Sequence, residues 1–86
     1  MDPSKHVKQG VNLLNRVLQY ASMVREDGEA LVGLTEQDWY VVSDLLFRMD
    51  VPEGTLPDEI DDYALGDDQR TIELSTREGP VRVERT

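Results

Sequence analysis

The sequence of 86 residues contains no cysteine and a single histidine, His6. Without cysteine the chain cannot form a disulfide, a zinc–thiolate site or a thiol nucleophile. No motif places His6 as the base of a serine or cysteine nucleophile. The few glycines are scattered along the chain, so there is no glycine-rich loop of the kind that cradles phosphates. We therefore expect a protein that is not an enzyme and that carries no cofactor.

Long apolar runs are also missing. Runs such as Trp39-Tyr40-Val41-Val42 fall far short of the roughly 20 residues that are needed to span a bilayer. The N-terminus has no apolar block typical of a signal peptide. These observations predict no membrane association and, by default, a cytoplasmic protein. The length predicts a single small domain over residues 1–86.

Basic residues are scarce and unevenly placed. The chain has 9 Lys and Arg against 18 Asp and Glu, which gives a net charge of −9. Residues 3–25 contain Lys5, Lys8, Arg16 and Arg25 and no acid. The acidity either serves binding to a basic partner or reflects a source adapted to high salt, which screens repulsion between carboxylates. The composition leaves both interpretations open.

The first 26 residues predict a long helix. Pro3 suits a first helical turn and Asp2 can cap it, while apolar residues from Val7 to Ala21 recur at spacings of three and four. The helix is long for so small a domain, and its stripe follows about three heptads. It either packs within its own core or also forms a homodimer interface. The expected interface residues are Leu13, Leu14, Val17, Leu18, Tyr20 and Ala21.

The remaining pattern completes an α+β fold. Residues 29–34 form either a strand or an extended connection, and Thr35 caps a second helix that ends near Asp50, with Asp38 completing a capping box. Pro57, the acids that follow it and Gly66 predict a short acidic helix over residues 57–65. Alternating apolar residues from Ile72 to Val83, with a turn at residues 77–79, predict a C-terminal β-hairpin.

This order of elements resembles that of winged-helix domains, although no sequence motif accompanies the resemblance. It implies that a third helix reads the major groove and that the hairpin serves as the wing. In this chain residues 57–62 fill the position of the reading helix, and their carboxylates would repel phosphates. Direct nucleic-acid binding is therefore disfavoured, and a winged-helix-like DNA-binding regulator is kept only as the alternative function.

The most distinctive segment is residues 49–69, which holds eight acids and no base. The spacing does not fit a calcium loop, because a register that begins at Asp58 or at Asp61 places Ile60 or Tyr63 at position 3 of the loop, which must supply an oxygen ligand. We expect no metal site. The acids either form a solvated face or dock on a basic groove of a partner protein, including one that normally holds nucleic acid.

The predicted function is thus that of an acidic regulatory module, acting as an inhibitor or a DNA mimic. A second flank of the helix that follows Thr35 carries two aromatic residues, which are either covered by the hairpin or exposed as a contact patch. The expected partner-binding residues are Asp58, Glu59, Asp61, Asp62, Asp67, Asp68, Tyr40 and Phe47.

Overall fold

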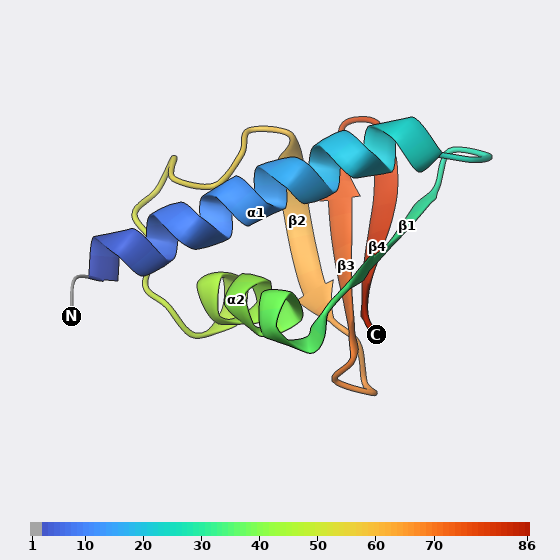
Figure 1. Cartoon of the computed structure of the whole chain (residues 1–86). Helices are drawn as coiled ribbons and strands as arrows, with labels where there is room; N and C mark the ends of the chain where they lie inside the picture. The colour runs from blue at the N-terminus through green and yellow to red at the C-terminus, as the bar shows by residue number, and fades with distance from the viewer. Residues whose placement is uncertain (1–2) are drawn as a thin grey trace.

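The computed structural model describes residues 3–86 and has an α+β fold with two helices and a four-stranded mixed sheet (Figure 1). Asp2, the expected cap of the first helix, lies outside the described residues. The elements are α1 (Pro3–Val24), β1 (Ala30–Leu34), α2 (Glu36–Phe47), β2 (Ile60–Leu65), β3 (Thr71–Thr76) and β4 (Gly79–Arg85).

The sheet has the strand order β1-β4-β3-β2, so β1 and β2 are its two edges. β1 runs parallel to β4, whereas the β4–β3 and β3–β2 pairs are antiparallel. The register brings Val32 beside Val83, Val83 beside Ile72, and Ile72 beside Leu65. Because side chains alternate along each strand, this register gathers the apolar residues on one face of the sheet.

Both helices pack on that apolar face. One cluster of buried side chains joins Leu14 and Ala21 of α1 and Leu45 of α2 to Ile72 and Val83 of the sheet. The opposite face is not covered by another element within the described chain. Across it the register aligns Leu31, Arg82, Glu73 and Ala64, and all four side chains are exposed. The molecule therefore has two layers, with helices on one side and an open sheet face on the other.

Most of the expected elements are confirmed. The first helix ends at Val24, close to the expected end, and residues 30–34 form a strand. Thr35 caps α2, because its side-chain oxygen accepts a hydrogen bond from the backbone N–H of Asp38 at 3.3 Å. The C-terminal hairpin is present as β3 and β4. α2 ends at Phe47 rather than near Asp50.

The expected acidic helix over residues 57–65 is wrong, and the winged-helix order is not confirmed. Residues 60–65 form β2, which pairs with β3 through Tyr63–Leu74 and Leu65–Ile72. As a short helix this segment would bury one weak apolar edge, whereas as a strand it pairs its backbone with β3 and places Tyr63 against the core. Tertiary pairing thus outweighs the helix signals of Pro57 and Gly66.

The expected homodimer stays a prediction, and burial limits which of its predicted interface residues could contact a second copy. Leu14, Val17, Leu18 and Ala21 are buried in the core of the same chain, so they cannot contact a second copy in this fold. Leu13 is half-buried against the core. Among the six expected interface residues, only Tyr20 is largely exposed, at 51%. In a homodimer through the predicted interface residues, only Leu13 and Tyr20 could therefore contact the second copy.

Candidate functional site

The six predicted acidic residues lie on and around the edge strand β2. Asp58 and Glu59 precede the strand, Asp61 and Asp62 belong to it, and the turn from β2 to β3 carries two more. The members of this acidic group, all of them exposed, are Asp58, Glu59, Asp61, Asp62, Asp67 and Asp68. The sequence prediction that these side chains face outward is therefore confirmed, although they are displayed by a strand and two turns rather than by a helix.

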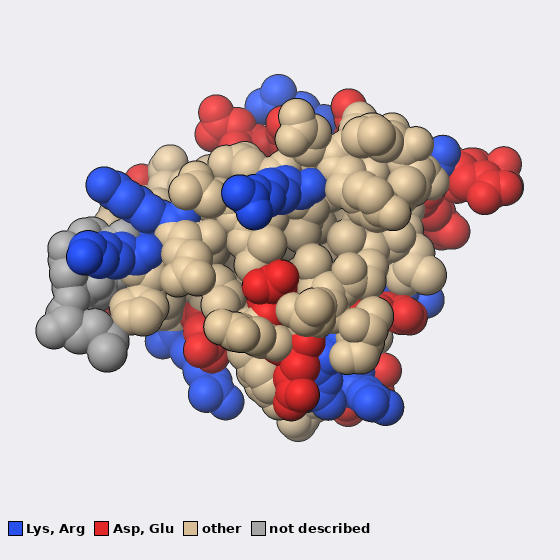
Figure 2. Space-filling view, viewed as in Figure 1, with Lys and Arg blue, Asp and Glu red and all other residues tan. Residues whose placement is uncertain are grey.

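None of these six carboxylates takes part in an ion pair within the described part of the chain. The three ion pairs found there are Arg25–Glu78, Arg48–Asp44 and Arg82–Glu73. In that range no Lys or Arg of α1 forms an ion pair with the acidic group. Instead, Lys and Arg side chains project along the face of α1 that Figure 2 presents. The acidic group is therefore free to attract positive charge from another molecule.

Asp68 has a local structural role. Its carboxylate accepts hydrogen bonds from the backbone N–H of Arg70 at 2.9 Å and from Oγ1 of Thr71 at 3.3 Å. The bond from Arg70 is the main cause that lowers the pKa of this carboxyl from its ordinary value of 3.8, and the bond from the Thr71 side chain acts in the same direction. Asp68 thus shapes the turn that begins β3.

The two aromatic residues of α2 are both partly exposed, and different strands contact them. Tyr40 is 42% exposed, and its hydroxyl accepts a hydrogen bond from Nη1 of Arg85 at 2.6 Å. The Arg85 guanidinium also lies 5.4 Å from the Tyr40 ring centre. Phe47 is 39% exposed and packs edge to face against Tyr63, with ring centres 5.5 Å apart. The end of β4 therefore covers part of Tyr40, whereas β2 covers part of Phe47.

The contact between Phe47 and Tyr63 joins the aromatic flank to the acidic segment. Leu65 lies on the same face of β2 as Tyr63, two residues further along, and is 39% exposed. Asp58 lines the same hollow as Tyr63, and the turn after Leu65 carries Asp67 and Asp68, whereas Asp62 faces the opposite side of the strand together with Ala64. We call the region around this strand the β2 surface; it consists of Phe47, Tyr63, Leu65 and the acidic group, and Tyr40, which contacts β4, lies outside it.

A hollow of about 500 Å³ adjoins the β2 surface where the chain passes from α2 to β2. Its apolar lining includes Met49, Leu56 and Ile60. Tyr63 contributes lining from β2. Acids from the connection, Asp50, Glu53 and Asp58, also line it. The hollow therefore combines apolar lining with negative charge, as the β2 surface does.

Tyr63 and Leu65 were not among the site residues predicted from the sequence. In the structure the Leu65 side chain is partly exposed. The spacing of Tyr63 and Leu65, two residues apart and flanking Ala64, is the strand signal that could have revealed their common face.

Within residues 3–86 no group of His, Asp and Glu side chains is arranged to hold a metal ion. No helix in the same range is long and apolar enough to cross a membrane. Comparisons with protein-family models, with curated proteins and with solved structures found no match.

Proposed function

We propose that this protein is a non-enzymatic regulatory module of the cytoplasm that docks the β2 surface on a basic surface of a partner protein. The observation that supports the proposal is that Phe47 and Leu65, both partly exposed, lie against or on β2, the strand around which the carboxylates without an ion pair in the described chain are placed. Protein interfaces commonly combine an apolar, aromatic centre with a polar rim. A purely solvated acidic face would not need the exposed aromatic side chains at its border.

Electrostatic attraction would provide speed and selectivity in this docking. Exposed carboxylates accelerate the encounter with a basic surface, and they repel nucleic acids and other acidic surfaces. Grooves that bind nucleic acid are rich in Lys and Arg. The specific form of the proposal is therefore an inhibitor that occupies such a groove in place of nucleic acid. The alternative, a DNA-binding regulator, has lost its proposed reading helix, because residues 60–65 form an acidic strand.

The test is affinity capture of partners from the native host with matched charge variants. The first variant changes Asp58, Asp61 and Asp62 to Asn. The control changes Glu26, Asp27 and Glu29, in the loop after α1, to Gln, Asn and Gln, so both variants have the same net charge. We expect the unmodified protein and the control to retain a basic partner. The first variant should lose that partner, most of all at low salt. Retention of labelled duplex DNA by the protein would instead favour the alternative function.

A further inference from the structure

The two edges of the sheet differ in how they are protected. β2 carries Asp61 and Asp62 and has a register shift between Ile60 and Asp62. Charged side chains and bulges of this kind prevent an edge strand from pairing with another chain. β1, the opposite edge, consists of Ala30–Leu34 and contains no charged residue and no bulge. The protein therefore protects one edge and leaves the other able to accept a strand.

The backbone of β1 presents hydrogen-bonding groups on its outer side. The carbonyl of Leu34 accepts a hydrogen bond from the N–H of Thr86 at 2.9 Å, so Leu34 is directed toward β4. The backbone groups of successive strand residues point to opposite sides, which directs Leu31 and Gly33 away from the sheet. Within residues 3–86 no other segment forms a backbone hydrogen bond with these two residues. They offer two donors and two acceptors to an added strand.

Apolar side chains accompany these backbone groups. Leu31 is 56% exposed on the open face of the sheet. Together with Val24 and Pro80 it lines a hollow of about 520 Å³ that extends from the start of β1 over β4 and β3. Met23, at the end of α1, is 79% exposed. A side chain of an added strand that lies beside Leu31 on the open face would therefore find an apolar contact, and contacts of this kind give strand addition its specificity.

The ends of β1 are acidic. Glu26, Asp27 and Glu29 precede the strand, and Glu36 follows it, all exposed. In Figure 2 acidic side chains project at the end of the molecule where Figure 1 places the loop after α1. A second copy in antiparallel pairing would bring its own Glu29 toward Glu36 of the first, and the like charges would repel each other. A strand flanked by Lys or Arg would be attracted at both ends.

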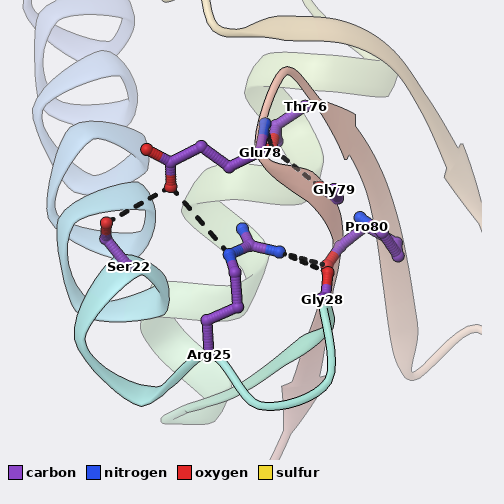
Figure 3. Close-up of polar contacts among 7 residues, drawn as sticks. All are labelled: Ser22, Arg25, Gly28, Thr76, Glu78, Gly79 and Pro80. Carbon is purple, nitrogen blue, oxygen red and sulfur yellow. Dashed lines mark hydrogen bonds and ion pairs between the residues drawn. The ribbon is translucent and has the colours of Figure 1, made fainter.

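The cations near the start of β1 are already engaged. Figure 3 shows Arg25 between the loop after α1 and the turn from β3 to β4. Its Nη1 donates to the carbonyls of Gly28 at 2.7 Å and Pro80 at 3.3 Å, and its Nε lies 3.9 Å from Glu78. Arg82 pairs with Glu73 at 3.2 Å. The Arg25 contacts also fix the start of β1, so the edge is ordered before any partner binds.

We propose that the β1 edge binds an extended, apolar segment of a partner protein, flanked by Lys or Arg, as a fifth strand of the sheet. This site lies at the opposite edge from the β2 surface and does not depend on the function proposed for that surface. Its recognition would rest on main-chain hydrogen bonds at Leu31 and Gly33, apolar contacts at Leu31, and attraction by the acids at the two ends.

The test uses a synthetic peptide with a Val-Thr-Val-Thr-Val core and lysines at both ends, added to the full chain. We expect amide hydrogen exchange to slow at Leu31 and Gly33, while Val32, already within the ladder, changes little. An N-methylated peptide that cannot donate these two bonds should bind about thirtyfold more weakly, because each lost bond contributes roughly 1 kcal/mol. A peptide with glutamates in place of the lysines should also bind about tenfold more weakly.

Protein variants locate the peptide on the molecule. Leu31→Thr keeps a strand-forming residue at an exposed position, so it should retain the fold while weakening binding several-fold. The variant Glu26→Gln, Asp27→Asn, Glu29→Gln should weaken binding, whereas Asp58→Asn, Asp61→Asn, Asp62→Asn should not. The reverse pattern would place the peptide on the β2 surface and overturn the proposal. Protection of Leu31 and Gly33 in the free protein, with a dimer in light scattering, would mean that a second copy covers the edge and would also overturn it.

Discussion

The ring of Phe47 meets the ring of Tyr63 edge to face, with ring centres 5.5 Å apart. This contact ties the last turn of α2 to the middle of β2, two elements that are separated by a connection of irregular structure. It therefore helps to hold the acidic edge strand against the rest of the molecule. It also places a partly exposed aromatic ring against β2, the strand that carries Asp61 and Asp62.

The first prediction concerns the strength of that contact. Phe47→Leu retains an apolar side chain but removes the aromatic pair, so we expect the free energy of unfolding to fall by about 0.5–1.5 kcal/mol. Tyr63→Leu should have an effect of similar or greater size, since Tyr63 is more buried. Denaturant unfolding of both single variants and the double variant measures the coupling. If the two losses simply add, the rings do not stabilise each other.

The second prediction concerns Gly79, the first residue of β4 after the turn from β3. Its φ of 124° is one that other residues rarely adopt, and a Cβ at this position would collide with the carbonyl oxygen of Gly28. We expect Gly79→Ala to lower the free energy of unfolding by about 2 kcal/mol or more. Gly54→Ala is the control, because Gly54 also has a positive φ but no atom stands near its would-be Cβ. Equal thermal destabilisation of the two variants would show that the Gly28 contact does not matter.

Local signals in the sequence predict most of the fold correctly. The apolar spacing of α1, the Thr35 cap of α2 and the alternation in β3 and β4 each describe an element whose local preference and tertiary packing agree. Residues 57–65 are the exception, because Pro57, the early acids and Gly66 favour a helix locally. Pairing of Tyr63 with Leu74 is a contact that only the folded sheet provides.

The candidate site was also predicted only in part, because some of its contacts exist only in the folded sheet. Exposure of the acids follows from their charge, since eight carboxylates without a local base cannot be buried. The proximity of Phe47 to Tyr63 depends on where α2 crosses the sheet, and the sequence carries no direct signal for that. The unprotected edge at β1 could be recognised only after the strand order showed that Ala30–Leu34 lies at the end of the sheet.

The third prediction concerns Asp68 and pH. Because the hydrogen bond from the N–H of Arg70 lowers the pKa of Asp68 in the folded state, the ionised carboxylate stabilises the fold at pH values above its ordinary 3.8. That stabilisation is lost as the pH falls through the lower, folded-state pKa. Asp68→Ala should therefore be less stable than the unmodified protein at neutral pH, and the difference should shrink in acid. A carboxyl titration by NMR that places the Asp68 pKa above 3.8 would contradict this explanation.

The last prediction separates a binding role of the acidic group from a role in solubility. Changing Asp58, Asp61 and Asp62 to Asn removes three exposed charges from β2 and the turn before it, where none has an ion pair in the described chain. The Asp62→Asn change retains a side-chain oxygen, which can still accept the bond that Asp62 takes from the N–H of Tyr63 at 2.8 Å. Relief of repulsion should therefore raise the free energy of unfolding by about 0.5–1 kcal/mol at low salt.

Salt provides the internal control for that result. Raising sodium chloride from about 0.01 to 1 M shortens the screening length from about 30 to 3 Å, so the melting temperature of the unmodified protein should rise toward that of the variant. A melting temperature that falls steadily with salt would instead show that attractive pairs dominate. If the acidic group binds a partner, capture by the variant should be weakest, relative to the unmodified protein, at low salt, where attraction contributes most. Capture that is unchanged at every salt concentration would leave these acids with a role in solubility, and the partner contact would then be sought at Tyr40 and Phe47.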